Sequence, residues 1–498
     1  MELAGLHSAP RSPLDSERDD SGGERAVGRR ATTNERQVTL ERSGRVIDAV
    51  DVWDFVHTHA TPGDAVFVAR LPDRQGEFAA VGSVVAVRAD GAQRFDVVRE
   101  AAAGWRKRLV ERTPAPCAQA PLWVGGFAFD GGPLAAPWQT WSGAWWWIPR
   151  HLYWRDATDG AWHLENRILG RPPTADAGAN SNPNADAMAD TNSTRDPGPM
   201  ADLDSRAGAP SASGARSRDV QPAETDEPAF CAAVTLAVQS IAAGKLDKVV
   251  LARAHRATAA AGTRYGGAET FAAATARDTR ALCFAIGRMG HGMFVGATPE
   301  LLVDVRGAHV CTTALAGTAP RHAEPTEDAR RASELLLRGK DQREHAWVER
   351  ALHETLAEHC TSVTSGPTGL RSTPDMHHLE TPLAGVQRRS DGVVTWIERF
   401  HPSPAVAGTP RQAALAQLRR SEPTERGWYA GPIGYATATG DGAAWVAIRS
   451  AHLEGDRALL YAGAGIVRDS VAQNEWAETE LKLGSMRAAL RTKAAEPT

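Results

Sequence analysis

One long segment that cannot fold by itself constrains the architecture of this chain. Residues 171–226 contain almost no large apolar side chain and are rich in Ala, Asp, Asn, Ser and Pro. Such a composition buries too little apolar surface to offset the entropy lost when the backbone becomes ordered. We therefore expect 171–226 to be a disordered linker or a long excursion, which divides the ordered chain into two parts.

The residues before this segment are of two kinds. Residues 1–36 are polar and rich in Gly, Ser, Arg and Asp, so we expect a disordered N-terminal tail. Residues 37–170 alternate apolar and polar positions in short runs such as "DAVFVARL" and "GSVVAV", with turn residues between them and a Trp-rich stretch. This pattern predicts a part built mainly of β-strands.

The segment 227–490 mixes helical and strand periodicity. Phe230, Val234 and Val238 recur at helical spacing, and "KVVLAR" then forms a compact β-branched run, which predicts a helix followed by a strand. No strand-GxGxxG-helix unit occurs, so the sequence favours a mixed α/β architecture with antiparallel sheet over a doubly wound fold. Further helices are predicted over most of 330–359 and over 411–422, and strands over 292–298, 445–455 and 457–467.

The charge balance and the cysteine pattern exclude several classes of function. Lys and Arg number 56 against 60 Asp and Glu, so we expect neither nucleic acid nor a membrane surface as partner and favour a small-molecule enzyme. The five cysteines form no CxxC pair and no Cys/His cluster, so we expect neither zinc nor disulfides. The N-terminus has no apolar signal segment, and no stretch approaches 18 apolar residues. We expect a soluble, cytoplasmic protein.

Two predicted helices each carry two acidic residues three positions apart. The pairs are Asp341 with Glu344 in "GKDQREHAWV" and Glu475 with Glu478 in "QNEWAETELK". Residues at i and i+3 share a helix face, so each pair directs two carboxylates to one side. Taken singly, each pair is also explained by the helix macrodipole, and Glu478 forms an ordinary i,i+4 pair with Lys482. Taken together, the pairs allow a Mg²⁺ site completed by oxygens of an anionic substrate.

Charged side chains elsewhere suit a site for such a substrate. Lys482 and Arg449 supply positive charge, Arg449 through its bidentate fork. Lys248 begins the run "KVVLAR", where burial lowers the pKa of a lysine towards that of a general base; a strand-end lysine that reaches solvent is the alternative. Glu300 in "VGATPELLVDV" has apolar neighbours, which raise the pKa of a carboxyl group and suit a general acid, with a buried salt bridge as the alternative.

Four further polar positions allow two interpretations each. The stretch "TTALAGTAPR" places Gly317 and Thr318 in a predicted loop, where backbone N–H groups bind an anion or simply form a turn. His378 in "MHHLETPLAGV" and Tyr429 in "GWYAG" stand in half-apolar surroundings. Each is either a ligand contact or a core residue with satisfied hydrogen bonds.

Nine motifs in a fixed order resemble those of a known family. Together they are similar to the chorismate-utilising enzymes, most closely the isochorismate synthase branch, over residues 226–490, and "WVGGFAFD" resembles the N-terminal part of the same enzymes. The resemblance implies a single large α/β domain of stacked, mostly antiparallel sheets flanked by helices, with a central active-site cleft and 171–226 as an insertion. The motifs are "KVVLAR", "VGATPELL", "TTALAGTAPR", "KDQREHAWV", "HLETPLAGV", "HPSPAVAGTPR", "RGWYAGPIGY", "VAIRSAHL" and "AGAGIVRDSVAQNEWAETELK".

The resemblance also implies roles for the acidic residues. Glu344 and Glu478 match the Mg²⁺ ligands of the family, and Asp341 and Glu475 match the supporting carboxylates. The metal is then expected to bind the ring carboxylate of chorismate.

The remaining motif positions match groups that handle the substrate. Lys248 matches the base that activates water for attack at C2, and Glu300 the acid that protonates the departing C4 hydroxyl. Tyr429 and Arg449 match the positions that hold the enolpyruvyl carboxylate. The other matched pocket positions are Gly317, Thr318, His378, Ala405, Gly463, Gly465 and Lys482.

A few positions separate the reactions within the family. Anthranilate synthases resemble this chain but lack a lysine at the position of Lys248, and salicylate synthases tend to carry Thr where Ala405 stands. The resemblance therefore favours isochorismate as the product, made by a monomer without a glutaminase partner. Salicylate synthesis, another chorismate reaction and a non-catalytic chorismate-binding module are the alternatives. Glu480 lies off the face of the acidic pair and keeps an ordinary surface role.

Overall fold

The computed structural model of the chain describes residues 38–112, 119–156, 160–169 and 224–495. The predicted tail at 1–36 lies outside these ranges, and so does the predicted insertion at 171–226 apart from its last three residues. There, the carboxylate of Asp226 accepts a hydrogen bond from the backbone N–H of Ala229 and caps helix α3 (Glu227–Ala242). The segment after the gap thus begins at a defined helix N-terminus.

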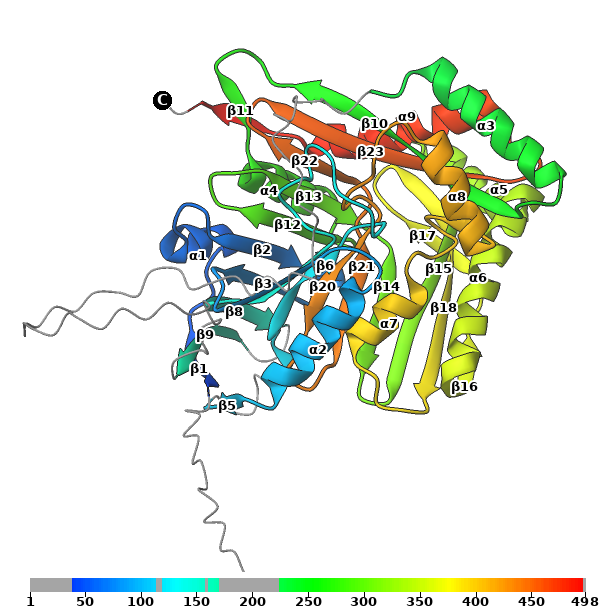
Figure 1. Cartoon of the computed structure of the whole chain (residues 1–498). Helices are drawn as coiled ribbons and strands as arrows, with labels where there is room; N and C mark the ends of the chain where they lie inside the picture. Colours follow the sequence, from blue (N-terminus) through cyan, green and yellow to red (C-terminus); the bar gives the residue numbers. More distant parts are fainter. Residues whose placement is uncertain (1–37, 113–118, 157–159, 170–223, 496–498) are drawn as a thin grey trace, which may run out of the picture. The chain divides into compact units, whose positions relative to one another are not determined.

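Twelve strands of the described ranges form the larger of two main sheets (Figure 1). β12 (Leu282–Arg288), from the segment after the gap, pairs antiparallel with β2 (Ala65–Arg70), from the segment before it. The two parts of the chain therefore share one sheet, and the expected single-domain α/β architecture is confirmed. The other strands, in spatial order around this pair, are β19 (Gly408–Thr409), β10 (Lys248–Thr258), β23 (Arg457–Ile466), β22 (Ser450–Glu454), β13 (Met293–Thr298), then β3 (Gly76–Val81), β8 (His151–Asp156), β9 (Ala161–Leu169), β1 (Thr39–Ile47) and β5 (Leu109–Glu111).

A second main sheet takes ten strands of the described ranges and again mixes both parts of the chain, because β6 pairs with β20. Among the strand pairs found in these ranges, only β1 with β5 is parallel. The ten strands are β16 (Cys360–Ser365), β18 (Met376–Gln387), β15 (His309–Pro320), β14 (Leu301–Arg306), β21 (Gly442–Val446), β20 (Pro432–Ala436), β6 (Trp123–Phe127), β7 (Ala144–Ile148) and β4 (Val85–Ala89), with β17 (Gly369–Ser372) beside β18. A small third sheet joins β11 (Thr263–Tyr265) to β24 (Thr492–Ala494).

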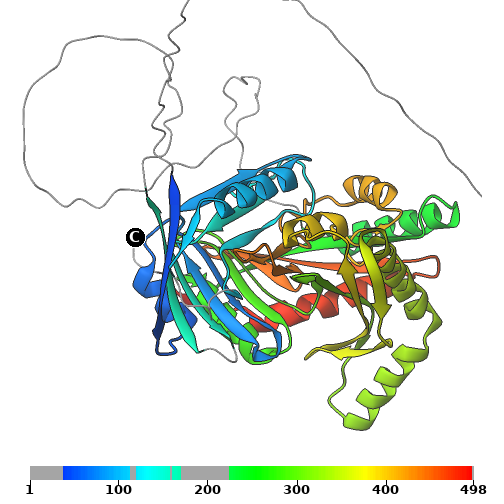
Figure 2. The ribbon, with the colours of Figure 1, turned by 90° about the horizontal axis from the view of Figure 1, so that it is seen from below.

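Helices pack against both main sheets. Helix α9 (Ala472–Ala489) lies against β23, and α6 (Gly339–His359) lies against β15 and β18 (Figure 2). The helices of the described ranges, besides α3, α6 and α9, are α1 (Val52–His59), α2 (Arg94–Arg106), α4 (Gly267–Arg277), α5 (Pro325–Leu337), α7 (Val393–Phe400), α8 (Arg411–Ser421) and a short 3₁₀ helix at Pro72–Arg74.

Strand β2 of the larger sheet is buried on both faces, which explains why it is apolar at almost every position. Phe67 belongs to the core between the two main sheets, and its ring lies 6.5 Å from that of Trp147 on β7. Its neighbours Val66 and Val68 point the other way, into a second core formed with α1, α4 and α9. Successive side chains of β2 therefore point alternately into the two cores.

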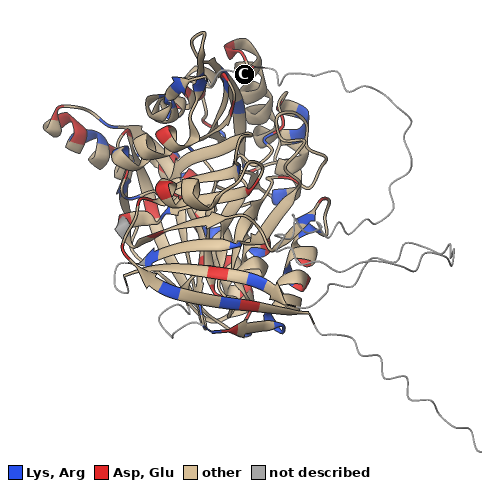
Figure 3. Cartoon of the chain, turned by 90° about the vertical axis from the view of Figure 1, so that its left-hand side faces the viewer, with Lys and Arg blue, Asp and Glu red and all other residues tan. Residues whose placement is uncertain are grey.

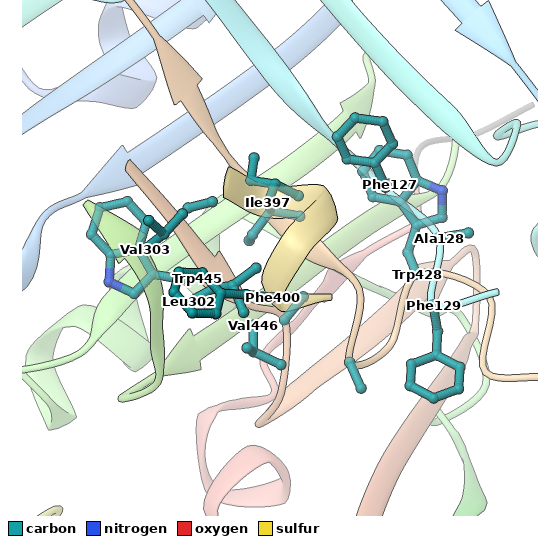
Figure 4. Packing of buried hydrophobic residues seen from close by; sticks show 14 of the residues in the cluster. Phe127, Ala128, Phe129, Leu302, Val303, Ile397, Phe400, Trp428, Trp445 and Val446 are labelled. Carbon is teal, nitrogen blue, oxygen red and sulfur yellow. The ribbon is translucent and has the colours of Figure 1, made fainter. Parts of the chain in front are cut away.

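Helix α7 packs on the smaller sheet at β14 and β21. Ile397 and Phe400 of this helix lie beside Val303 of β14 and Trp445 of β21 (Figure 4). All four side chains are buried. The apolar positions of 393–400 thus recur at the helical spacing that a one-sided contact requires.

The structure differs from the predicted elements in several places. The helix predicted over most of 330–359 is two helices, because Arg338 has extended backbone angles and separates α5 from α6. The first part of the chain, predicted to be mainly strands, also contains α1 and α2. The strand predicted over 445–455 is interrupted where Arg449 takes a positive φ of 52°.

Charges of both signs are interspersed over the described elements. Figure 3 shows Lys and Arg residues among Asp and Glu residues on the same strands and helices. None of the helices in the described part of the chain is both long and apolar enough to cross a membrane.

Phe67→Ala should lower the free energy of unfolding by about 3–5 kcal/mol, because it leaves a cavity where a ring that is 1% exposed joins two sheets. The control Val46→Ala, on β1 at 65% exposure, should change it by at most about 0.5 kcal/mol. Denaturant titrations followed by Trp fluorescence measure both. Equally small effects would contradict a core shared between the sheets.

Candidate active site

Helices α6 and α9 bring the two predicted acidic pairs together. Lys340, in the first turn of α6, places its Nζ 2.6 Å from Oε1 of Glu475, in the first turn of α9. Its charge also acts on Asp341, Glu344 and Glu478. Burial lowers the pKa of Lys340, but these carboxylates outweigh it and hold the pKa above its ordinary value. We call the four carboxylates the acidic cluster.

Burial affects the carboxyl groups of the acidic cluster differently. Asp341 and Glu475 are 5% and 1% exposed, and burial, assisted by the charge of a neighbouring glutamate, raises the pKa of both. Burial also acts to raise the pKa of Glu478, but Nζ of Lys482 lies 2.7 Å from its Oε1 and holds the pKa below its ordinary value. The predicted i,i+4 pair is therefore present, and it places the charge of Lys482 against the cluster.

Lys248 is buried and does not reach solvent. It is 1% exposed, and its Nζ lies 3.1 Å from Oε1 of Glu344. Strand β23 runs beside β10 and presents Gly465 at this point. A Cβ at Gly465 would collide with the carboxylate of Glu344. The pairing of these two strands therefore makes room for the contact between Lys248 and Glu344.

Glu300 is a buried acid in the same region. It lies between β13 and β14 at 6% exposure. Burial raises its pKa to about 7, against the opposing charges of Lys248, Lys482 and Arg449. None of the ion pairs within the described ranges includes Glu300. The carboxyl group is thus half protonated near neutral pH, in the direction expected for a general acid.

Arg449 and His378 hold each other in one orientation. Nη2 of Arg449 lies 3.3 Å from Nε2 of His378. A guanidinium only donates, so Nε2 accepts, and the proton on Nδ1 is donated to the carbonyl of Gly317 at 3.1 Å. Burial, with the charges of Arg449 and Lys482, lowers the pKa of His378 well below its ordinary value. The ring is therefore neutral, with one tautomer favoured.

The prediction that Gly317 and Thr318 lie in a loop is wrong. Both lie inside β15, at a bulge where the register with β18 shifts, and Gly317 has a φ of 74°. Glycine serves a bulge as well as a turn, so local sequence does not separate the two. The N–H of Thr318 donates to Oδ1 of Asp341 at 3.4 Å. This N–H therefore orients a carboxylate of the acidic cluster.

Tyr429 and Gly463 shape the opposite wall. The ring of Tyr429 stacks on that of Tyr461, with centroids 5.0 Å apart, and burial raises its pKa to about 12. Tyr429 is thus a hydrogen-bond donor at neutral pH. The carbonyl of Gly463 accepts a hydrogen bond from Nζ of Lys482 at 2.8 Å, which holds this lysine between β23 and Glu478.

Most of the predicted residues line one cavity, whose walls come from strands of both main sheets and the loops beside them. Predicted residues on its walls are Glu300, Gly317, Thr318, Glu344, His378, Ala405, Tyr429, Arg449, Gly463, Gly465 and Lys482. Lys248, Asp341, Glu475 and Glu478 adjoin it through the contacts given above. Glu480 instead pairs with Arg253 and Arg487, away from the cluster, as expected.

Sequence reasoning missed two groups that support this cavity. Lys340 directly precedes Asp341 in the sequence, and this position next to a predicted site residue is the signal that could have identified it. Arg426 is 4% exposed and donates to the carbonyls of Val250 and Val406, which line the cavity. Its i,i+4 partner Glu422 resembles a surface ion pair in sequence, so nothing local marked it.

Comparison with known families identifies the chain. The family described as "Chorismate binding enzyme" matches residues 26–491. This chain belongs to that family, and the resemblance carried by the nine motifs is confirmed.

Alignments with individual relatives cover about half of this chain and about half of each relative. The salicylate biosynthesis isochorismate synthase of Pseudomonas aeruginosa is 39% identical over 264 residues, 52% of this chain and 54% of that protein. Isochorismate synthase MenF of Bacillus subtilis is 41% identical over 209 residues, 42% of this chain and 44% of that protein. The chain thus spans about half the length of the curated relatives it matches. The structure of MenF, the menaquinone-specific isochorismate synthase from Escherichia coli, shares the fold, with a TM-score of 0.67 and 21% identity over 91% of this chain and 95% of that chain.

Glu300→Gln should stabilise the protein more at high pH than at low pH. The folded-state pKa of about 7 lies above the ordinary 4.5, so the native state binds the extra proton and loses stability as pH rises through this window. Between pH 5 and pH 8 the difference between variant and wild type should shift by about 2–3 kcal/mol in favour of the variant. Urea titrations at both pH values measure it, and a constant difference would contradict the raised pKa.

Proposed function

We propose that this protein converts chorismate to isochorismate. The observation that carries the proposal is that Glu300, an acid with a pKa of about 7, shares a cavity wall with Arg449 and lies near the buried amine of Lys248. An acid and a base beside a cation for carboxylates suit a reaction in which one hydroxyl leaves and water adds at another carbon. Two relatives with about 40% identity are named isochorismate synthases, which supports the same reaction.

We further propose that the acidic cluster binds Mg²⁺. Its donors are all carboxylate oxygens, which suit a hard cation, and Oδ2 of Asp341 is buried without a hydrogen bond, with Nη1 of Arg338 at 3.4 Å as its ion-pair partner. Glu344 and Glu478 would hold the metal, and Asp341 and Glu475 would support them. Mg²⁺ bound there would neutralise and orient the ring carboxylate of the substrate.

The cationic wall of the cavity suits the second carboxylate of chorismate. Arg449 is fixed by His378, which leaves other N–H groups of the guanidinium for a bidentate contact. The hydroxyl of Tyr429 is a donor in the same cavity. We propose that both bind the enolpyruvyl carboxylate, with Lys482 adding positive charge.

Two proton transfers then complete the reaction. Nζ of Lys248 takes a proton from the water that forms the new C–O bond at C2, and Glu300 gives its proton to the C4 hydroxyl, which departs as water. One water is consumed and one is released, so the product is an isomer of the substrate. A Glu344 that turns towards the other carboxylates would leave the amine of Lys248 without its ion-pair partner and free to accept this proton.

The chemistry also bears on partners. Because the nucleophile is water and not ammonia, we propose that the enzyme needs no glutaminase subunit, and that it acts as a cytoplasmic monomer on a small molecule. Lys and Arg residues alternate with Asp and Glu residues along the elements in Figure 3, which supports the absence of a nucleic-acid partner.

Incubation with chorismate and Mg²⁺ in ¹⁸O-labelled water tests the reaction. We expect isochorismate as the main product, carrying one ¹⁸O at the new C2 hydroxyl, with no formation when EDTA is present. Chromatography with mass spectrometry resolves the products. Salicylate with pyruvate, anthranilate after addition of ammonia, or bound but unchanged chorismate would each contradict the proposal.

Gly465→Ala should damage the site without unfolding the protein. The added methyl group displaces the carboxylate of Glu344 from Lys248, and a misplacement of about 1 Å costs on the order of 10²-fold in activity. The carboxylate is the far end of a flexible side chain and can turn aside, so the protein should still fold, with a lower free energy of unfolding because the buried Lys248 loses its ion-pair partner. Gly484→Ala, on α9 in open space, is the control and should keep full activity with a gain of about 0.5–1 kcal/mol. A fully active Gly465→Ala enzyme would refute this role of Glu344.

A further inference from the structure

Three histidines that are distant in sequence meet away from the cavity. His59 ends helix α1, His151 begins β8, and His163 lies on β9. One ring nitrogen from each lies within 4.8 Å of the other two. His163 is buried, and the other two are half-buried, so the group is open to solvent on one side. None of the three lines the cavity described above.

The fold explains why these rings converge. β8 and β9 pair with His151 opposite Glu165 and Tyr153 opposite His163, so His151 and His163 are diagonal neighbours on one face of the sheet. Helix α1 packs on that face through Phe55, whose ring stacks on His59 and meets His163 edge to face. The helix therefore carries His59 onto the strand pair.

The ring nitrogens are oriented as metal ligands usually are. Nδ1 of His59 hydrogen-bonds to the carbonyl of Phe55 at 2.9 Å, which leaves Nε2 for another partner. Nε2 of His163 lies 3.3 Å from Nδ1 of His151. Two nitrogens bound to one tetrahedral Zn²⁺ at about 2.0–2.1 Å lie about 3.3–3.4 Å apart. A hydrogen bond between His151 and His163 would explain this distance by itself. It would not explain why a ring nitrogen of His59 lies within 4.8 Å of both.

Neighbouring charges are of both signs: Glu165 supplies negative charge, and Arg45, Arg150 and Arg167 supply positive charge. Arg45 approaches Nδ1 of His163 at 3.5 Å, and Oε1 of Glu165 lies 3.9 Å from its Nε2. Nε2 of His163 can bind a metal only in the tautomer whose proton is on Nδ1, and in that tautomer Nδ1 does not accept a hydrogen bond from Arg45.

We propose that His59, His151 and His163 form a binding site for a divalent transition metal of the Zn²⁺ class, with a fourth position left to water or to Glu165. Three imidazoles favour Zn²⁺ and similar transition metals over Mg²⁺. The carboxylates of the acidic cluster favour Mg²⁺. The site is therefore chemically distinct from the cluster. A bound metal would clamp α1 to the β8–β9 pair.

Metal titration of the metal-free, full-length protein tests this proposal. Co²⁺ binding is followed by visible absorption, which is intense for tetrahedral sites, and Zn²⁺ binding by calorimetry with excess Mg²⁺ present. The variants are His59→Gln, His151→Gln and His163→Gln. The matched control is His57→Gln, an exposed histidine on the same helix. A second control, Glu478→Gln, reports on the acidic cluster.

We expect one equivalent of Zn²⁺ to bind to the wild type and to both controls. Each of the three variants should weaken binding by more than the roughly 10- to 100-fold that loss of an outer-shell partner costs. His59 is half-buried, so His59→Gln should fold normally, as circular dichroism would verify. Wild-type protein without stoichiometric Zn²⁺ binding, a His59→Gln variant that binds as wild type does, or loss of binding in Glu478→Gln would overturn the proposal.

Discussion

Three lysine–carboxylate contacts make it possible to bury the acidic cluster. Lys248 from β10 pairs with Glu344, Lys340 from α6 with Glu475, and Lys482 from α9 with Glu478. Each lysine comes from a different element, so the charge balance exists only when all three elements are in place. The side chains of Lys248 and Glu475 are each 1% exposed, so removal of the partner of either leaves an uncompensated buried charge, which costs about 3–5 kcal/mol. The cluster is therefore stable only inside the completed fold.

The two main sheets supply the rest of the cavity from segments that lie far apart in the sequence. β10 and β23 of the larger sheet carry Lys248, Gly463 and Gly465, and the smaller sheet contributes the bulge of β15 opposite His378. The cores on both faces of the larger sheet bury these strands and exclude water around the charges. Exclusion of water is also what raises the pKa of Glu300 to about 7, the property that the proposed acid requires.

Much of the fold follows from the sequence, and the site follows only in part. Helical spacing revealed that Asp341 and Glu344 share a face, but spacing carries no information on which other helix that face meets. The contact between α6 and α9 is made by Lys340, whose partner Glu475 lies 135 positions further along the chain. Glycine suits turns and bulges alike, so the residues around Gly317 do not separate a loop from the bulge that the structure shows in β15. The prediction against zinc rested on the cysteines alone, and His59, His151 and His163 converge only through strand register and helix packing, which a one-dimensional pattern does not contain.

The central claim is that carboxylates from α6 and α9 hold one divalent cation between them. Binding of Mn²⁺, a paramagnetic substitute for Mg²⁺, measured by electron paramagnetic resonance with chorismate present, tests this claim most directly. We predict one Mn²⁺ per chain and a large loss of affinity in both Glu344→Gln and Glu478→Gln, one from each helix. Glu480→Gln, whose carboxylate pairs with Arg253 outside the cluster, should bind as the wild type does. Unchanged Mn²⁺ affinity in the first two variants would contradict the account.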